Sequence, residues 1–203
     1  MISQPTQKRI AFFDFDGTIT EKDSLLEIIK YINGVPSFYL GFALLSPWLI
    51  AMKLKLISNS KTKERALRYF FGGLTSEAFQ KKCEQFALDI IPTLVRKKAL
   101  LEIRKHIEQG TEVVVVSASP ENFVSPWCRA NHLPCIATRL EIKANKITGK
   151  INGENCYGQE KVNRINESYD LQQYGNIYAY GDSNGDKEML SISTLRFFKP
   201  FRN

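Results

Sequence analysis

The sequence has few of the residues that build disulfide frameworks and zinc sites. Only four cysteines and two histidines occur among 203 residues, and the cysteines form no C-x-x-C pair and no metal-ligand spacing. We therefore expect free thiols in a reducing compartment, where most of them serve packing. We also expect no signal peptide at the start of the chain, because the apolar residues that follow it include two aspartates. Together these absences predict a cytoplasmic location.

Acidic side chains are outnumbered by basic ones, 21 against 28, which gives a formal net charge of +7. Such a balance favours anionic partners: phosphate esters, nucleic acids or acidic membrane surfaces. The aromatic residues are not interleaved with a basic stripe, so we expect no nucleic-acid partner. A hydrophobic content of 43% and a charged content of 24% are ordinary for a globular chain, which argues against wholesale disorder.

A long uninterrupted hydrophobic run is also missing. No charged residue occurs between Tyr31 and Met52, but Pro36 and Pro47 interrupt this stretch. A membrane-spanning helix needs about 20 mainly apolar residues. We therefore predict buried or interfacial helices here rather than a transmembrane span.

What the sequence does contain is an alternation of apolar strands and amphipathic helices. Four segments predict strands: KRIAFF, TEVVVVSAS, NIYAYG and TLRFF. Helices are predicted over residues 25–32, with Ser24 as the cap, and over residues 61–71, 76–91, 92–109, 120–131 and 159–172. Strands that alternate with helices indicate an α/β fold with a parallel sheet.

Two excursions interrupt this alternation. Residues 21–92 are helical and apolar and are too long for a simple crossover, which predicts an inserted α-helical cap. Residues 137–158 alternate around Ala144-Asn145 and predict a β-hairpin within the core. The catalytic core is then made of residues 1–20 and 93–203.

Unusual polar residues follow three of the predicted strands. They are Asp14 to Thr18, Ser117 to Ser119, and Gly181 to Asp186, and a further helix supplies Lys161. Ligands of open α/β sheets bind outside the carboxyl ends of the strands. We therefore expect these segments to meet in one pocket.

The residue types in that pocket suit phosphoryl transfer, which depends on positioning and on neutralising charge. The Asp14 carboxylate can attack phosphorus, and Asp16, two residues further on, can act as acid and base. Asp14 and Asp182 offer the oxygen ligands that Mg²⁺ prefers. Lys161 and the Ser117 hydroxyl would then meet the phosphate oxygens.

At these residues the sequence resembles the haloacid dehalogenase superfamily. DFDGT matches the first motif of that family, the strand that ends at Ser117 the second, Lys161 the third and GDSNGD the fourth. The four motifs occur in the family's order from Asp14 to Asp186 and so cover most of the chain. The resemblance implies a Rossmann-like parallel sheet with an inserted cap.

The resemblance also implies the roles of individual residues. Asp14 would be the nucleophile and Asp16 the acid and base. The implied ligands of Mg²⁺ are Asp14, Asp16 through its backbone carbonyl, Asp182 and, usually indirectly, Asp186. The expected phosphate-binding residues are Thr18, Ser117, Ala118 and Lys161.

The cap and the hairpin resemble those of the phosphoserine phosphatase-like branch. Related enzymes place a substrate-contacting acid where Asp23 lies, and Arg65, on a predicted cap helix, could meet an anionic substrate. Each residue also has a plainer interpretation, Asp23 as a helix cap and Arg65 as a solvated side chain. The segment SASP replaces the glycine pair that follows the second-motif serine in that branch, which weakens the case for phosphoserine.

The sequence thus predicts a Mg²⁺-dependent phosphatase that acts on a small phosphorylated metabolite, such as phosphoserine, through a phospho-aspartate. A phosphotransferase would use the same intermediate. A carbon–halogen hydrolase needs neither Asp16 nor Asp182, so these residues argue against it. An anion-binding module that has lost catalysis is the non-enzymatic alternative.

A lipid phosphate is the alternative substrate. With SASP at this position, the sequence looks closer to a subgroup of hydrolases of unassigned substrate. Some bacterial phosphatidylglycerophosphatases resemble that subgroup, including a very apolar cap. Residues 38–57 would then admit an acyl chain or contact the inner membrane surface peripherally, helped by Lys53, Lys55 and Lys61. The plainer interpretation assigns these residues to the inner faces of cap helices. The sequence leaves the oligomeric state open.

Overall fold

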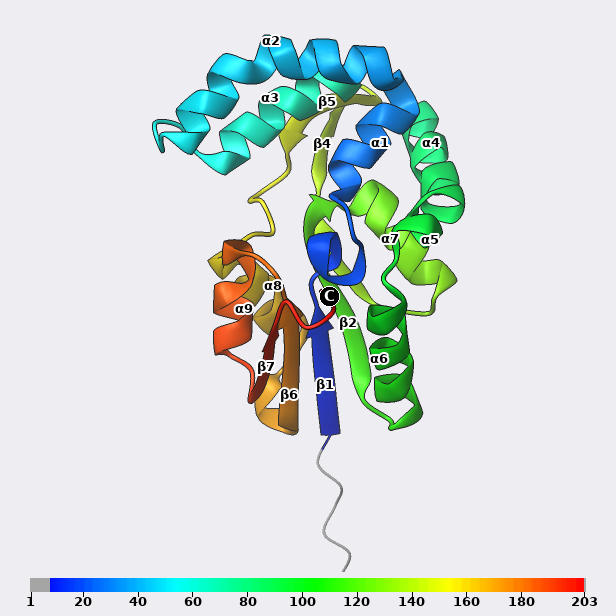
Figure 1. The fold of residues 1–203 in the computed structure, drawn as a ribbon, viewed down its shortest axis with the longest axis vertical. Helices are drawn as coiled ribbons and strands as arrows, with labels where there is room; N and C mark the ends of the chain where they lie inside the picture. Colours follow the sequence, from blue (N-terminus) through cyan, green and yellow to red (C-terminus); the bar gives the residue numbers. More distant parts are fainter. Residues whose placement is uncertain (1–7, 203) are drawn as a thin grey trace, which may run out of the picture.

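A five-stranded parallel sheet forms the centre of the protein, whose computed structural model describes residues 8–202 (Figure 1). The strands are β1 (Lys8–Phe13), β2 (Glu112–Pro120), β3 (Cys135–Thr138), β6 (Tyr174–Gly181) and β7 (Leu195–Phe198). They lie in the order β3-β2-β1-β6-β7, and each neighbouring pair is parallel. The predicted α/β class is confirmed. Residues 1–7, assigned to the core from the sequence, lie outside the described part of the chain.

Helices cover both faces of the sheet. They are α6 (Lys97–Glu108), α7 (Glu121–Ala130), α8 (Gln159–Ser168) and α9 (Lys187–Ser191). Successive residues of a strand point to opposite faces. In β1, Ala11 and Phe13 pack in the cluster that contains α6 and α7, whereas Ile10 and Phe12 pack in the cluster that contains α8 and α9. This double burial explains why residues 10–13 of β1 and residues 113–116 of β2 are all apolar.

Three predictions for this layer need correction. The helix predicted over residues 159–172 ends at Ser168, because Tyr169 is extended. Strand β3 was missed because it has only four residues, two of them partly exposed, and so carries no long apolar run. The helix predicted over residues 92–109 is two helices, α5 (Ile91–Leu94) and α6. Val95 between them is extended and bridges to Thr20, so the two connections from the sheet to the segment 21–92 run side by side.

An upper layer lies beyond the carboxyl ends of the strands, at the top of Figure 1. It contains α1 (Ser24–Asn33), α2 (Val35–Lys53), α3 (Asn59–Phe71), α4 (Ser76–Asp89), β4 (Leu140–Lys143) and β5 (Lys146–Ile151). The antiparallel pair β4-β5 is the predicted hairpin, and Ala144 and Asn145 at its tip have positive φ angles. The prediction that residues 137–158 form this hairpin within the core needs correction, because residues 137 and 138 belong to β3 and the hairpin packs on the upper helices. Gly73 and Leu74 exchange backbone hydrogen bonds with Ile147 there.

The start of α1 differs from the prediction by one residue. Asp23, not Ser24, is the N-cap, and its carboxylate accepts a hydrogen bond from the Leu26 N–H at 3.1 Å. A carboxylate at this position satisfies a donor that the first helical turn leaves free. The plainer interpretation of Asp23 as a helix cap is therefore confirmed.

Helix α2 is continuous through Pro47, so the break predicted there is wrong. A proline inside a helix lacks the N–H that would bond to the carbonyl four residues earlier. That carbonyl, of Ala43, instead accepts a hydrogen bond from the Ser46 hydroxyl at 2.7 Å. The local substitution allows the 19-residue helix to continue.

Most of α2 is exposed. Of the helices in residues 8–202, it is the one whose length and apolar composition would suffice to cross a membrane, and only 11% of its apolar window is buried. Tyr39, Leu40, Leu44 and Ile50 are all more than half exposed. The interpretation of residues 38–57 as inner faces of cap helices is wrong for these side chains.

Candidate active site

The first polar segment turns sharply at the carboxyl end of β1. Asp14 is fixed there because its N–H donates to the Tyr180 carbonyl at 2.9 Å. A tight turn over residues 15–19 follows, in which Gly17 has a φ of +81°. A Cβ atom on Gly17 would overlap the Asp182 carboxylate. Glycine is therefore required both for the backbone conformation and for the approach of the two polar segments.

Lys161 lies at the centre of the site. Its Nζ donates to Asp14 Oδ1 at 2.6 Å, to Asp186 Oδ1 at 2.7 Å and to the Val116 carbonyl at 2.8 Å. The side chain is only 1% exposed, and these three bonds use all the donors of an ammonium group. One lysine thus joins β1, β2 and the loop after β6.

The second oxygen of Asp186 organises the loop after β6. Asp186 Oδ2 accepts hydrogen bonds from the N–H groups of Asp182 and Ser183, at 3.1 and 2.9 Å, and from the Ser183 hydroxyl at 2.8 Å. A carboxylate that accepts several bonds is held rigidly and stays ionised. The sequence pattern GDSNGD therefore builds a loop that orients Asp182 and Asp186 toward Asp14.

Negative charge exceeds positive charge among these groups. Burial, with Asp186 adding to it, raises the pKa of Asp14 to about 7 although Lys161 opposes the rise. Burial also raises the pKa of Asp182, against the opposing effect of Arg202. The pKa of Asp186 is lowered, because Lys161 and Ser183 outweigh the effect of burial. Three carboxyl groups thus face two cations, Lys161 and Arg202, at a place where burial disfavours the ionised form of Asp14 and Asp182.

This arrangement fits a divalent cation. One carboxylate oxygen from each of Asp14, Asp182 and Asp186 lies within 4.8 Å of the others, and all three residues are buried. Hard carboxylate oxygens are the ligands that Mg²⁺ prefers, and a cation would compensate the excess negative charge. The metal ligands expected from the sequence thus lie together, with the backbone of Asp16 in the adjoining turn.

Asp16 points toward α1. Its Oδ1 accepts from the Ser24 N–H at 2.6 Å, and its Oδ2 accepts from the Ser119 hydroxyl at 2.6 Å. The carboxylate therefore sits at the amino terminus of a helix, where negative charge is stabilised. Asp16 also lines the cavity described below.

The expected phosphate-binding residues occupy different depths. Ala118 lines the cavity, whereas Ser117 is completely buried and its Oγ accepts from the Ser119 N–H at 3.0 Å. The Thr18 hydroxyl is buried without a hydrogen-bond partner. Lys161 lines the cavity beside Asp14.

A cavity of about 540 Å³ separates this cluster from the upper helices. Asp14, Asp16, Lys161 and Asp182 form its lower wall, and α1, α2 and α3 supply the opposite wall. The apolar lining from these helices consists of Leu25, Leu26, Ile29, Phe42, Leu49, Met52 and Ala66. The wall at the sheet is thus polar, and the opposite wall is mainly apolar, with Asn59, Thr62 and Lys63 of α3 as polar members.

The two expected substrate contacts differ in position. Asp23 lines the cavity, and burial together with the nearby Asp16 raises its pKa to about 6. Arg65 does not line it; its guanidinium lies 4.8 Å from the centre of the Trp48 ring on the outer side of α3. The structure brings Asp23, and not Arg65, to the cluster.

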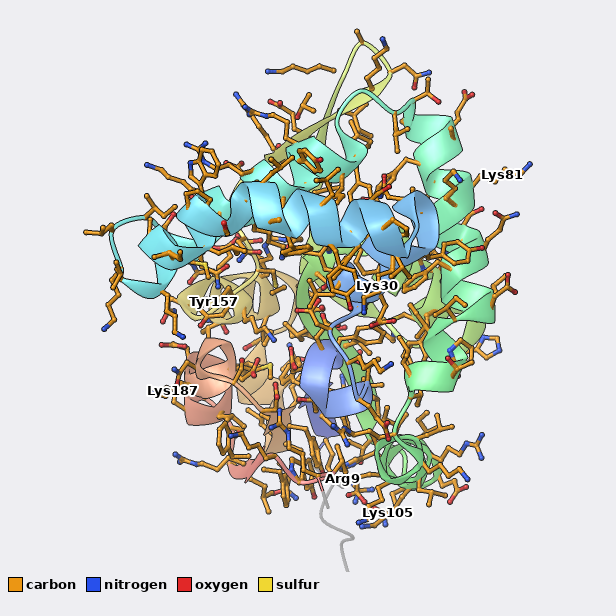
Figure 2. All side chains as sticks on the ribbon, turned by 45° about the horizontal axis from the view of Figure 1, so that its top comes forward. Arg9, Lys30, Lys81, Lys105, Tyr157 and Lys187 are labelled. Carbon is orange, nitrogen blue, oxygen red and sulfur yellow. The ribbon has the colours of Figure 1, made fainter. Side chains whose placement is uncertain are left out.

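Lys63 was missed from the sequence. It extends from α3 into the cavity and donates to the Ala118 carbonyl and, at 3.2 Å, to Asn155 Oδ1. Burial lowers its pKa to about 8. Tyr157, which Figure 2 shows between the levels of α2 and α9, lines the same cavity. Nothing in the sequence singles out Lys63, because it lies among other basic residues of a helix.

Arg202 was also missed. It lines the cavity and forms an ion pair with Asp182. Phe201 beside it stacks on Phe13 and Tyr180, which brings the carboxyl-terminal segment to the end of β1. No motif surrounds Arg202, so only the packing of Phe201 reveals its place.

Comparison with known proteins identifies the family. The family of haloacid dehalogenase-like hydrolases matches residues 11–191, which include every polar segment described above. The chain belongs to this family. The resemblance inferred from the four motifs is confirmed, and the protein is a hydrolase.

Two relatives of this haloacid dehalogenase-like hydrolase match most of its length. The protein CicA of Caulobacter vibrioides is 36% identical over 194 residues, which cover 94% of this chain and 85% of CicA. A protein of Mycobacterium tuberculosis named as a probable phosphatase is 32% identical over 197 residues, which cover 92% of this chain and 67% of that protein.

A solved structure extends the likeness to the cap. A phosphoserine phosphatase, solved as an analogue of its phospho-aspartyl intermediate, has a TM-score of 0.63 with this hydrolase at 21% identity. The match covers 94% of this chain and 86% of that one. The hydrolase therefore shares the fold of the phosphoserine phosphatase-like branch.

Proposed function

We propose that this hydrolase is a Mg²⁺-dependent phosphatase that cleaves phosphomonoesters through a phospho-aspartate on Asp14. The observation that carries the proposal is the buried cluster in which Lys161 joins Asp14 to Asp186 beside Asp182. The family is one of hydrolases, and a relative 32% identical is named as a probable phosphatase. Residues 21–92 would act as the cap above the cluster.

In the first half of the proposed reaction, a carboxylate oxygen of Asp14 attacks phosphorus. The bond between phosphorus and the ester oxygen breaks, and the carboxyl group of Asp16 gives its proton to that oxygen. Lys161 keeps Asp14 in place by its bond to Oδ1 and supplies positive charge beside the transferring group.

In the second half, the Asp16 carboxylate takes a proton from water, and the water oxygen attacks the phosphorus of phospho-Asp14. The bond between phosphorus and Asp14 breaks, so that inorganic phosphate leaves and both carboxyl groups return to their first state. Asp14, Asp182 and Asp186 would hold Mg²⁺ when it is bound, and that ion supplies positive charge against the phosphate oxygens.

The test is release of inorganic phosphate from p-nitrophenyl phosphate by purified protein, with and without Mg²⁺. We expect turnover with Mg²⁺, loss of turnover after chelation, and loss in Asp14→Asn, which keeps the shape of the side chain. Asp89→Asn, an exposed aspartate at the end of α4, is the matched control and should retain full activity. Wild-type turnover in Asp14→Asn would refute the proposed nucleophile.

For the substrate, we propose a small phosphorylated metabolite such as phosphoserine. The cavity supports it because both Asp23 and Lys63 reach the space beside the cluster from the cap side. A small ionic substrate could pair with charged side chains of either sign there. A phosphate-release screen over phosphoserine, sugar phosphates and nucleotides tests this choice.

A lipid phosphate is the second candidate, and the apolar upper wall of the cavity favours it. Leu25, Phe42, Leu49 and Met52 offer contacts for an acyl chain and no hydrogen bonds for a polar metabolite. Helix α2 carries the exposed apolar residues described above, and no acidic side chain occurs between Glu27 and Glu64. We propose on this basis a peripheral contact with the inner surface of an anionic membrane.

The two candidates separate in two measurements. Phosphatidylglycerophosphate in the substrate screen should be hydrolysed faster than phosphoserine if the lipid candidate holds. Co-sedimentation with anionic phospholipid vesicles should occur for the unmodified protein and decrease in Leu40→Glu, whose side chain is 60% exposed. Failure to bind anionic vesicles would rule out the membrane contact.

A further inference from the structure

Ser119 is the one hydroxyl in residues 8–202 that donates a hydrogen bond to Asp16. It follows Ser117 and Ala118 at the end of β2 and is 4% exposed. Its Oγ donates to Asp16 Oδ2 at 2.6 Å, and the Ser24 hydroxyl on α1 lies 3.5 Å from the same Oγ. Ser119 is therefore buried between the sheet, the turn after β1 and the first residue of α1.

The position of Ser119 is fixed independently of Asp16. Its N–H donates to Ser117 Oγ at 3.0 Å, and the neighbouring Ala118 carbonyl accepts from Thr138 Oγ1 at 2.6 Å. The hydroxyl thus approaches Asp16 from the end of β2, where these two hydrogen bonds hold the segment although the pairing with β3 is irregular. A hydrogen bond from a fixed, buried hydroxyl to a carboxylate is short and strongly directional.

The two bonds to Asp16 act on different oxygens. Ser24 N–H binds Oδ1 and Ser119 Oγ binds Oδ2, so together they fix the plane of the carboxyl group. A carboxyl group held by one oxygen can rotate about the bond that joins it to Cβ, because this torsion has a broad energy minimum. Without Ser119, the carboxyl group would spend less time in the orientation needed for proton transfer.

We propose that Ser119 is a positioning residue that orients Asp16 for transfer of a proton to the departing alcohol. This inference rests on the proposed phosphatase function and assigns to it a residue outside the four family motifs. Ser119 need not touch the substrate, since it acts through the Asp16 carboxyl group.

Substrates whose leaving groups differ in basicity can test whether Ser119 orients Asp16 for proton transfer. An alkyl phosphate releases a strongly basic alkoxide and depends on protonation by the acid, whereas p-nitrophenyl phosphate releases a stabilised phenolate that depends on it little. The ratio kcat/KM reports the steps up to release of the alcohol. We therefore expect Ser119→Ala to lower kcat/KM for an alkyl phosphate about tenfold more than for p-nitrophenyl phosphate.

The experiment compares kcat/KM on both substrates for the unmodified protein, Ser119→Ala and Ser119→Thr. The threonine variant keeps the hydroxyl and should restore much of the selective loss. Ser193→Ala is the matched control, because Ser193 is 6% exposed and its Oγ donates to the Leu190 carbonyl at 2.7 Å away from the site. Ser119→Gly removes the same hydroxyl and replaces the alanine variant if that variant does not fold.

The outcomes separate this inference from the proposed function. An equal loss on both substrates, no loss, or a gain on the alkyl phosphate would overturn the role of Ser119 while leaving the phosphatase intact. If the unmodified protein hydrolyses neither ester, the proposed function is refuted and, with it, the role of Ser119. A selective loss on the alkyl phosphate, restored by threonine, supports both.

Discussion

Lys161 holds a positive charge where water hardly reaches, and its neighbours make this possible. The side chain is 1% exposed, and both Asp14 and Asp186 bind its ammonium group. Although burial alone would lower the pKa of Lys161, these two carboxylates outweigh it and raise the pKa. The lysine and the two aspartates are therefore interdependent: removing one leaves the others as uncompensated buried charges.

Substitution of Lys161 by methionine should accordingly destabilise the protein. We expect the free energy of unfolding to fall by about 3 kcal/mol, because a buried ionic group loses its partner. Urea denaturation followed by circular dichroism, with chelator and at mildly alkaline pH where the carboxyl groups are ionised, measures the change. Lys105→Met, which removes a 60% exposed lysine paired with Glu102, should change stability by less than 1 kcal/mol. Equal effects of the two substitutions would contradict this account.

At the residue scale, sequence reasoning succeeds where a strand end specifies a position. Asp14 and Asp182 follow predicted strands directly, so a parallel sheet predicts both at its carboxyl edge, and the pairing of β1 with β6 brings them together. Lys63 and Arg202 reach the same cavity from a helix of the upper layer and from the last described residues. Their places depend on how α3 and the carboxyl-terminal segment pack, and no local pattern encodes that packing.

At the scale of elements, the contact between β5 and α3 depends on the absence of one side chain. Gly149 has a φ of +81°, and a Cβ atom there would overlap the backbone of Arg68. Gly153, after the same hairpin, has a φ of +80° but no atom within 4 Å of that position. Both glycines have a positive φ angle, but only Gly149 lies so close to the backbone of another segment.

This difference predicts that the same substitution at the two glycines lowers stability by different amounts. Gly149→Ala and Gly153→Ala should both lose stability from the positive φ angle, and Gly149→Ala should lose about 1–3 kcal/mol more, because backbone atoms cannot move aside cheaply. Thermal denaturation of the two variants measures the difference. Equal melting temperatures would show that the hairpin shifts freely on α3.

Two elements differ from what their local sequence predicts. Pro47 predicts a break, yet the Ser46 hydroxyl satisfies the Ala43 carbonyl and α2 continues. Strand β3 exists because β2 offers a free edge, although its four residues alone carry little strand signal. In both cases a contact with a neighbour outweighs the intrinsic preference of the segment.

At the scale of the whole molecule, the upper layer and the sheet contact each other through different groups on the two sides of the cavity. On one side the backbone joins them, since Glu21 N–H donates to the Leu94 carbonyl and Arg96 N–H to the Ile19 carbonyl, each at 2.8 Å. Across the cavity, Lys63 reaches from α3 to the Ala118 carbonyl and Asn155. A substrate between the layers would therefore lie beside the Lys63 ammonium group.

Lys63 should consequently govern binding more than chemistry. We expect Lys63→Met to raise KM for a phosphate ester about tenfold with a smaller change in kcat, because a cation that attracts the anionic substrate is lost. Lys61→Met, two residues earlier on the same helix and exposed, is the control and should leave KM unchanged. Steady-state kinetics on p-nitrophenyl phosphate gives both constants, and a loss confined to kcat would contradict a binding role.

The pH dependence of KM tests whether Lys63 binds the substrate as a cation. Because burial lowers the pKa of Lys63 to about 8, the side chain is charged below that pH and neutral above it. KM of the unmodified protein should therefore rise as pH increases through 8, whereas KM of Lys63→Met should start high and lack this rise. Lys61→Met should follow the unmodified protein, since its Lys63 is intact. A rise of the same size in Lys63→Met would assign the titration to another group and remove Lys63 from substrate binding.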